Sequence, residues 1–344
     1  MTPSLRPVSG SPRGVHDLLV PWVHDGGEPL TVRTSGSSGV PKEVVLSQRA
    51  VVASAHATLD RLGGPGQWLL GLPVSGVGGL QVLVRSILAG CEPVHLGEHD
   101  GLASALRSFT SSRRYAAVVP TQLYRWAAAG ELPTLAEFDA ILVGGASVDP
   151  DLLADARRAG ARVLRTYGMT ETSGGCVYDG VPLDGVEVRV DQAGQIWLRG
   201  PMLFDGYVGQ PHPASAWFAT ADRGELGPDG TLRVHGRIDD VVVSGGVNVP
   251  LGSVEQAIRG MPGIAEVAVV GAADPEWGSR VVAAVVVTDD ADVTLSDLRD
   301  RVDAQGLARA WAPRQLLRLG QLPLGPTGKV DRVRLAALAA DPKV

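Results

Sequence analysis

The chain has 344 residues, of which 44% are hydrophobic and 20% charged, and its formal net charge is −6. This length suggests two domains with a substantial core. Acidic and basic residues are interspersed, which argues against nucleic acid as the main partner because a basic stripe is the expected footprint. No apolar run approaches the ~18 residues that a membrane span needs.

Cysteine and histidine usage excludes further classes. Cys91 and Cys176 form no disulfide framework and no metal-ligand pair, which indicates a reducing cytoplasm. The seven histidines are scattered without an HExxH motif, so a zinc site is not expected. The first residues contain only a short apolar patch, broken by Pro21, and are not expected to act as a signal peptide.

From residue 30 onward, short β-branched runs alternate with helical stretches, which is the pattern of an α/β fold. The first expected elements are a strand at 43–46, a helix at 48–62 with Ser47 as its N-cap, a strand at 67–73 and a helix at 79–90 ended by Gly90. Further buried strands are expected at 93–96, 116–120, 139–145 and 162–168.

From about residue 181, short alternating strands with turn signals predict a small β-rich section. A boundary is expected within 235–246, and the elements beyond it are helices at 253–261, 295–306 and 333–340 and strands at 264–274 and 279–290. The sequence thus predicts a large N-terminal α/β domain, residues 1–237, with layered sheets plus the β-rich section. A small C-terminal α+β lid domain, residues 238–344, would follow, joined by a hinge.

The loop TSGSSGVPK, residues 34–42, is suited to an anion. Its glycines let successive backbone N–H groups point at a ligand, while the hydroxyl groups add donors and Lys42 adds a charge. The spacing G-x-x-G-x-x-K differs from the G-x-x-x-x-G-K-[ST] of P-loop kinases and GTPases, which disfavours those enzymes. Taken alone, the segment also fits a linker or a Ser/Gly hairpin loop.

A second loop, residues 165–175, follows a strand that is expected to end at Thr166. Ligands of open α/β sheets collect at the carboxyl ends of strands. Glu171 offers a hard oxygen ligand for Mg²⁺, and Tyr167 could stack on a base. A helix start capped by Thr170 or Thr172 is the alternative.

Two later segments carry single polar residues of interest. Asp222 could bind vicinal ribose hydroxyls as an acceptor, and Arg237 as a donor, although a turn acid and a surface arginine are plain alternatives. Lys329 lies in the Pro/Gly loop 322–332, where a solvated lysine is the ordinary interpretation.

Together, and in this order, the four segments resemble the adenylate-forming superfamily of acyl- and aryl-CoA synthetases, luciferases and peptide-synthetase adenylation domains. TSGSSGVPKEV is similar to the family's phosphate loop, YGMTET to its Y-G-x-T-E, GRIDD to its hinge region and PTGKVDR to its C-terminal P-x-x-x-G-K. The resemblance spans residues 31–333 and implies a two-step reaction. A carboxylate attacks the α-phosphorus of ATP to give an acyl-adenylate and pyrophosphate, and then the lid turns so that a thiol, usually CoA, displaces AMP.

The resemblance implies a role for each matching residue. The β- and γ-phosphates would be held by Thr34, Ser35, Gly36, Ser37, Ser38, Gly39 and Lys42. The adenine would be lined by Gly144, Gly145, Ala146, Thr166, Tyr167 and Gly168, and the ribose would be held by Asp222 and Arg237. The catalytic group would comprise Lys329, which bridges the carboxylate and the α-phosphate, Glu171 on Mg²⁺ and Thr170. Asp239 would be the hinge, and Gly245 and Gly246 would face CoA.

Within the superfamily, the chain looks most like the o-succinylbenzoate:CoA ligases of menaquinone biosynthesis. SGGVNV, residues 244–249, is close to SGGENI of that group, and LPVSGVGGL partly matches its LP-x-x-H-x-x-GL, with Gly76 in place of the histidine. Arg85 lies in the apolar segment 79–90, where an unpaired charge is costly. We therefore expect it to pair with the second carboxylate of o-succinylbenzoate, the alternative being a helix-surface arginine. Ser173, Gly174 and Gly175 would line the same pocket.

Two departures from the family pattern stand out. Glu43 replaces the usual glycine after Pro-Lys, and it adds an acid near the phosphates or points away along the strand. The phosphate loop begins at residue 34, much earlier than in most members, so a shortened N-terminal region is expected.

Several alternatives stay open. The acid could be another aryl or short acyl acid, the acceptor could be a carrier protein, and the chain could be a non-catalytic nucleotide-binding remnant or a P-loop kinase. The oligomeric state is also open, a homodimer being among the options.

Overall fold

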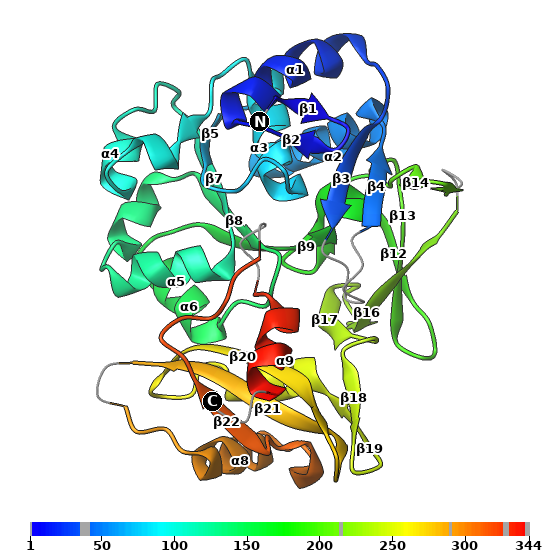
Figure 1. The fold of residues 1–344 in the computed structure, drawn as a ribbon. Helices are drawn as coiled ribbons and strands as arrows, with labels where there is room; N and C mark the ends of the chain where they lie inside the picture. Colours follow the sequence, from blue (N-terminus) through cyan, green and yellow to red (C-terminus); the bar gives the residue numbers. More distant parts are fainter. Residues whose placement is uncertain (1, 35–41, 213–215, 289–290, 326–329, 341–344) are drawn as a thin grey trace.

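The computed structural model describes residues 2–34, 42–212, 216–288, 291–325 and 330–340. Figure 1 shows two bodies, with the strands from β18 (Val241–Ser244) onward below the larger body. Within the described residues the strands form five sheets. No helix in these ranges is long and apolar enough to cross a membrane.

A seven-stranded sheet forms the centre of the larger body, in the order β11-β10-β9-β8-β7-β5-β6. Its strands are β5 (Gln67–Leu70), β6 (Val94–His95), β7 (Arg114–Val118), β8 (Ala140–Gly144), β9 (Val163–Met169), β10 (Gly174–Tyr178) and β11 (Val181–Pro182). Strands β5 to β9 run parallel, whereas β10 and β11 are antiparallel to their neighbours. The parallel strands are almost continuously apolar because both faces of the sheet are covered by helices.

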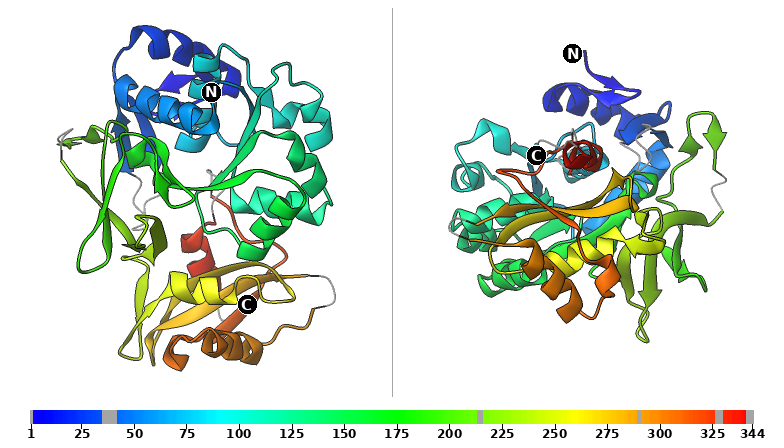
Figure 2. Two further views of the ribbon diagram at one scale, coloured as in Figure 1. Left: turned by 180° about the vertical axis from the view of Figure 1, so that it is seen from behind. Right: turned by 60° about the horizontal axis from the view of Figure 1, so that its bottom comes forward.

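Helices cover this sheet in two layers. One face packs against α1 (Pro12–Asp25), α2 (Gln48–Leu62) and α3 (Val77–Ala89), and the other against α4 (Leu102–Leu106), α5 (Pro120–Ala128) and α6 (Pro150–Arg158). Seen from behind in Figure 2, α1 and α2 lie at the end of the molecule opposite to the lower body.

Two smaller sheets complete the larger body, and a short hairpin, β1 (Ser4–Leu5) with β2 (Val8–Ser9), precedes α1. The first sheet joins β3 (Leu30–Thr34), β4 (Lys42–Leu46), β14 (Gly206–Tyr207) and β15 (Gln210–Pro211). The second joins β12 (Glu187–Val190), β13 (Gln195–Arg199), β16 (Phe218–Leu226) and β17 (Leu232–Arg237). The phosphate-loop segment thus lies between two paired strands of a hairpin.

The lower body is a five-stranded sheet with helices on both faces. Its strands are β18, β19 (Val247–Pro250), β20 (Ile264–Asp274), β21 (Gly278–Val287) and β22 (Gln315–Arg318). One apolar core includes side chains of α7 (Leu251–Ile258) and α8 (Leu295–Ala304), and a second includes α9 (Arg332–Ala340). The bodies approach at Gly260, where a Cβ atom would lie 3.2 Å from the Asp149 carboxylate.

The expected α/β architecture is confirmed, and α2 has the expected bounds. Ser47 stands at the predicted N-cap of α2, and its hydroxyl bonds Asp205 at 3.3 Å instead of a helix N–H. The expected strand end at Thr166 is wrong, because β9 continues to Met169, where its last residues pair with β10. The boundary between residues 237 and 238 stays a prediction.

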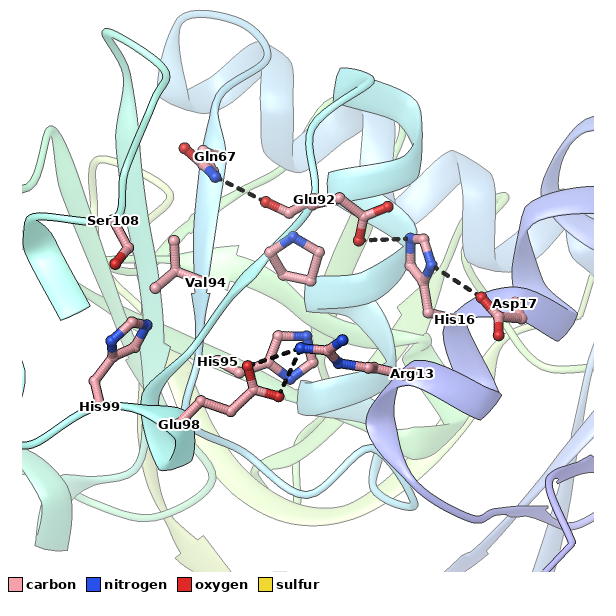
Figure 3. Close-up of a pocket in the computed structure, with 11 residues that line it drawn as sticks. Arg13, His16, Asp17, Gln67, Glu92, Val94, His95, Glu98, His99 and Ser108 are labelled. Atoms are coloured by element: carbon pink, nitrogen blue, oxygen red, sulfur yellow. Dashed lines mark hydrogen bonds and ion pairs between the residues drawn. The ribbon is translucent and has the colours of Figure 1, made fainter.

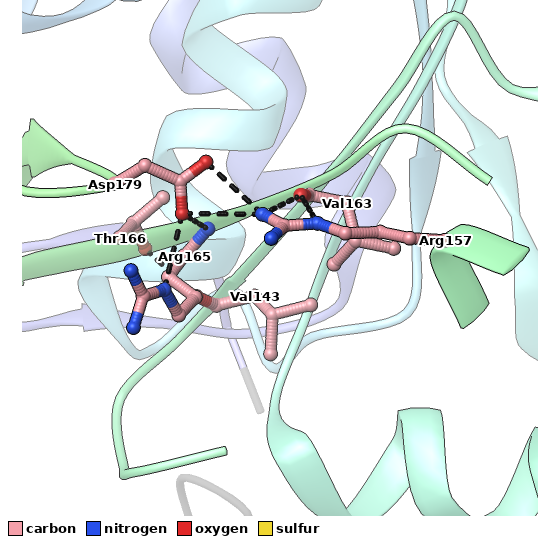
Figure 4. A network of polar contacts seen from close by, with 6 residues as sticks. All are labelled: Val143, Arg157, Val163, Arg165, Thr166 and Asp179. Atoms are coloured by element: carbon pink, nitrogen blue, oxygen red, sulfur yellow. Dashed lines mark hydrogen bonds and ion pairs between the residues drawn. The ribbon is translucent and has the colours of Figure 1, made fainter. Parts of the chain in front are cut away.

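A polar network fixes the start of β9. Figure 4 shows Arg157 and Arg165 converging on the carboxylate of Asp179, which follows β10. The same carboxylate accepts from the backbone N–H of Arg165 at 3.2 Å. These contacts tie α6, β9 and the end of β10 together at the edge opposite to the carboxyl end of β9.

Candidate active site

The carboxyl ends of β8 and β9 lie unusually close together. Gly144 is the register partner of Thr166, and a Cβ atom at residue 144 would collide with the Thr166 hydroxyl. That hydroxyl donates to the Val143 carbonyl at 3.3 Å. A side chain at residue 144 would displace the Thr166 hydroxyl, so glycine allows the two strand ends to pack closely here.

Tyr167 leads from these strand ends to the β16–β17 hairpin. Its hydroxyl donates to Asp222 Oδ2 at 2.8 Å, and Arg237 is the register partner of Asp222, with 4.0 Å between Arg237 Nη1 and Asp222 Oδ1. Burial raises the pKa of the Asp222 carboxyl. Burial, followed by the charge of Asp222, raises the pKa of Tyr167. The structure therefore brings together the two residues expected at the ribose and one expected at the adenine.

Arg237 also contacts the expected hinge. Its Nε and Nη2 atoms both donate to the carboxylate of Asp239 at 2.7 Å. This pairing raises the pKa of Arg237. The hinge residue and the expected ribose ligand are thus electrostatically coupled.

Glu171 lies in the short 3₁₀ turn η3 (Thr170–Thr172) that follows β9. The Thr172 hydroxyl holds the turn by accepting from the Met169 N–H at 2.8 Å, so the capping function falls to Thr172. Glu171 Oε1 accepts from the Tyr207 hydroxyl at 2.9 Å, and Lys42 Nζ lies 5.1 Å from the Tyr207 ring centroid. A carboxylate and a lysine that contact the same tyrosine at a strand end fit a Mg²⁺-bound polyphosphate.

The remaining phosphate and lid residues are partly described. Ser35 to Gly39 and Lys329 lie outside the described residues. Thr34 pairs with Lys42 across the hairpin, and Glu43 pairs with Arg33 at 2.8 Å. Of the two interpretations of Glu43, the one in which it points away along the strand is favoured.

The expected CoA residues belong to the lower body. Gly245 and Gly246 form the two-residue turn between β18 and β19, both with positive φ, and Gly245 packs against the ring of Trp277. A glycine pair suits this type of hairpin turn because both positions require φ > 0.

Arg85 is only 3% exposed, which contradicts the helix-surface alternative. Its Nη2 donates to Thr58 Oγ1 at 3.1 Å and its guanidinium lies 5.0 Å from the Trp68 ring centroid. Within the described part of the chain, Nε has no hydrogen-bond partner. Burial lowers the pKa of Arg85, because the charge is held without an acidic neighbour.

Gln81, one turn before Arg85 on α3, links this helix to the expected acid pocket. Its Nε2 donates to the Ser173 carbonyl at 2.8 Å, and Gly174 follows in β10. The Ser173 hydroxyl itself donates to the Met202 carbonyl at 2.9 Å. Arg85 and the segment Ser173–Gly175 therefore flank one helix–strand junction.

Sequence reasoning missed several partners, namely Thr58, Trp68, Gln81 and Tyr207. Gln81 carried a usable signal, since it is a second polar residue on the buried side of α3, four residues before Arg85. Tyr207 lies far from every motif and becomes significant only through the pairing of β14 with β4.

A cavity of about 600 Å³ lies elsewhere, between α1 and the edge strand β6. Figure 3 shows Arg13 paired with Glu98, and His16 between Asp17 and Glu92. The lining includes the histidine pair His95 and His99, which are four residues apart. In the described ranges, however, no three His, Cys, Asp or Glu side chains are placed to hold a metal ion.

Two family profiles match the chain, AMP-binding enzyme over residues 32–208 and AMP-binding enzyme C-terminal domain over residues 253–329. The chain belongs to the AMP-binding enzyme family. The resemblance drawn from the four motifs is thereby confirmed.

Several named members of the AMP-binding enzyme family are similar to this chain in sequence and structure. A probable 2-succinylbenzoate–CoA ligase of Mycobacterium tuberculosis is 44% identical over 90% of this chain and 84% of its own length. The o-succinylbenzoate CoA synthetase MenE of Bacillus subtilis, solved with the acyl-adenylate intermediate OSB-AMP, is 28% identical, with a TM-score of 0.73 over 89% of this chain and 68% of that one. The amide bond synthetase McbA of Marinactinospora thermotolerans has a TM-score of 0.76 at 28% identity, over 90% of this chain and 68% of that one.

Proposed function

We propose that this chain is an ATP-dependent 2-succinylbenzoate–CoA ligase of menaquinone biosynthesis. It would form 2-succinylbenzoyl-adenylate and pyrophosphate, and then 2-succinylbenzoyl-CoA and AMP. The observation that carries the proposal is Arg85, a buried cation without an acidic partner in the described residues, on the helix whose Gln81 bonds the Ser173 carbonyl. The names of the M. tuberculosis and B. subtilis relatives support the same substrate.

The substrate chemistry explains the need for this cation. 2-Succinylbenzoate carries two carboxylates, of which one is activated and the other remains charged. A carboxylate brought into an apolar pocket must be paired to offset its lost hydration. Arg85 would supply that pair through its planar guanidinium, with Thr58 and the Trp68 ring fixing the orientation.

The nucleotide would lie across the carboxyl ends of β8 and β9. Backbone at Gly144, Gly145 and Ala146 would lie along the adenine, and Asp222 would accept from ribose hydroxyls. Thr34 to Gly39 and Lys42 would hold the β- and γ-phosphates. Mg²⁺, when bound at Glu171, would neutralise charge on the phosphates during adenylation.

Lys329 would stabilise the charge that develops as the carboxylate attacks the α-phosphorus. Movement of the lid about Asp239 would then bring the hairpin turn at Gly245 and Gly246 to the acyl-adenylate for attack by CoA. We further propose a cytoplasmic location, and a homodimer stays among the options for the assembly.

A second candidate is an adenylating enzyme with another acid or another acceptor. The amide bond synthetase McbA supports this second candidate, because its TM-score of 0.76 is similar to the 0.73 of MenE.

Pyrophosphate release with ATP, Mg²⁺ and a panel of carboxylic acids tests the proposal. We expect 2-succinylbenzoate to be the best substrate, with AMP as the nucleotide product and CoA required for turnover. Turnover of another acid with no response to 2-succinylbenzoate would refute the substrate, and ADP as product would point to a kinase. Lys329→Ala is expected to abolish adenylate formation while ATP binding is mostly kept, whereas unchanged adenylate formation would refute its assigned role.

A further inference from the structure

The segment Phe204–Val208 connects the phosphate-loop hairpin with the turn that carries Glu171. Tyr207 pairs with Val44 on β4, two residues beyond Lys42. The N–H of Phe204 donates to the Glu171 carbonyl at 2.9 Å. A short stretch of backbone thus bonds both elements that are expected to hold the triphosphate.

The Tyr207 side chain makes the same connection at the level of charged groups. Its hydroxyl donates to Glu171 Oε1 at 2.9 Å, and the face of its ring lies 5.1 Å from Lys42 Nζ. The first contact orients the carboxylate, and the second is a cation–π interaction, which holds an ammonium group without neutralising it.

The ring itself is held in place by other aromatic side chains. Phe204 meets Tyr207 edge-to-face at 5.2 Å between centroids, and His212 stacks on Phe204 at 5.0 Å. The acceptor of the Tyr207 hydroxyl is a carboxylate oxygen, so the hydroxyl acts as the donor in this contact.

We propose that Tyr207 is a positioning residue that orients Glu171 toward the metal of Mg–ATP and holds Lys42 beside the same phosphates. The inference rests on the proposed function, in which Glu171 and Lys42 bind Mg–ATP. A hydrogen bond to one carboxylate oxygen fixes the plane in which the other can bind metal, and such outer contacts strongly affect metal affinity.

Calorimetric titration with ATP, in Mg²⁺ and in EDTA, tests this role without depending on turnover. Tyr207→Phe keeps the ring and removes the hydroxyl, so the affinity for Mg–ATP should fall about tenfold while the affinity for metal-free ATP stays unchanged. Tyr207→Leu also removes the ring, so the affinity for metal-free ATP should fall as well. In turnover, Tyr207→Phe should raise the Mg²⁺ concentration needed for half-maximal rate.

Tyr115→Phe is the matched control, since it removes a buried hydroxyl that donates to the Gly64 carbonyl at 3.0 Å, on a helix–sheet contact outside the proposed site. We expect it to lower the melting temperature without changing the effect of Mg²⁺ on ATP affinity. Tyr207→Phe behaving like this control, or weakening both forms of ATP equally, would overturn the proposal.

The outcomes also separate this inference from the proposed function. A wild-type protein that binds Mg–ATP but releases no pyrophosphate with any acid would refute the ligase and leave the Tyr207 comparison valid. A wild-type protein whose ATP affinity does not depend on Mg²⁺ would refute the inference.

Discussion

At the scale of single residues, Arg85 has the most unusual surroundings. It is buried against Thr58 and Trp68, and within the described part of the chain its neighbours include no carboxylate that would balance its charge. Holding such a charge lowers the stability of the free protein, because desolvation is not offset by an ion pair. Arg85 is therefore expected to raise the affinity for the substrate and, at the same time, to lower the folding stability of the free protein.

Arg85→Met should separate these two effects. We expect the melting temperature of the free protein to rise, because an apolar side chain of similar length replaces a buried cation. The KM for 2-succinylbenzoate should rise by about tenfold to a hundredfold, as expected for losing a charged hydrogen bond, with the KM for ATP unchanged. Steady-state kinetics and thermal unfolding measure both, with Arg85→Lys as the control that keeps charge. A lower melting temperature together with an unchanged KM would contradict the assignment.

Asp222 gives a prediction about pH. Burial raises the pKa of this carboxyl, so protonation favours the folded state. Its contribution to stability is therefore greatest below the ordinary carboxyl pKa and is lost as pH rises through the raised value. Near neutral pH, the melting temperature of Asp222→Asn should equal or exceed that of the wild type. The difference between the two melting temperatures should become smaller in acid. Its KM for ATP should rise about tenfold, because a charged acceptor for hydroxyl groups is lost.

Thermal melts over a pH series, together with ATP titrations at neutral pH, check this prediction. Asp229→Asn, in the exposed turn between β16 and β17, serves as a control outside the site. If the melting temperature of Asp222→Asn exceeded that of the wild type by more in acid than at neutral pH, the prediction would be contradicted.

At the scale of secondary-structure elements, the β3–β4 hairpin accounts for the departure at Glu43. Glu43 lies directly opposite Arg33, and the pair is exposed. Exposed cross-strand pairs contribute little, about 0.2–1 kcal/mol. We expect Glu43→Ala to lower the free energy of unfolding by no more than that and to leave kcat and the KM for ATP unchanged. A marked change in ATP affinity in titration would instead assign the acid to the phosphate site.

An ion cluster around the buried carboxylate of Glu255 binds three elements of the lower body together. Glu255 on α7 accepts from Arg259 at 2.5 Å, from Arg332 on α9 at 2.6 Å and from the N–H of Val269 on β20 at 3.0 Å. Arg332 stands three residues after Lys329, so the cluster anchors one end of that loop.

Glu255→Gln would remove the carboxylate that accepts from both Arg259 and Arg332, and Arg332 would keep only its longer contact with Asp240 at 4.0 Å. We expect a loss of about 3 kcal/mol in the stability of the lower body, as for breaking a buried pair. Chemical denaturation measures it, and Glu225→Gln, which removes an exposed partner of Arg233, is the matched control with a loss below about 1 kcal/mol. An equal loss of unfolding free energy in Glu255→Gln and Glu225→Gln would contradict this prediction.

At the scale of the whole molecule, the two bodies have separate cores. The fully buried apolar side chains of the larger body come from residues up to Leu232, and those of the lower body begin at Val249. Units with separate cores need not unfold together. Scanning calorimetry should therefore resolve two transitions, of which an acyl-adenylate analogue raises the one of the larger body and Glu255→Gln lowers only the other. One transition that shifts as a unit in both experiments would contradict this division.

Sequence patterns predicted the elements well wherever periodicity and burial agree, as in α2 and in the apolar strands of the central sheet. They also placed Asp222 and Arg237 at one site, because each lies in a recognisable family motif. They failed where a contact depends on chain segments that are distant in sequence. The hydroxyl of Ser47, at the predicted N-cap of α2, bonds Asp205 instead of a helix N–H, and Tyr207 reaches Glu171 only because β14 pairs with β4.

The separation of the two cores also bears on how such enzymes diversify. Arg85, which is proposed to select the acid, contacts Thr58 and Trp68 of the larger body, while the cluster around Glu255 lies within the lower one. A substitution that changes acid preference therefore needs no compensating change in the element that carries the proposed catalytic lysine. Recombination that joins the larger body of one relative to the lid of another would leave both interiors intact, and only the contact surface between them would have to be readjusted.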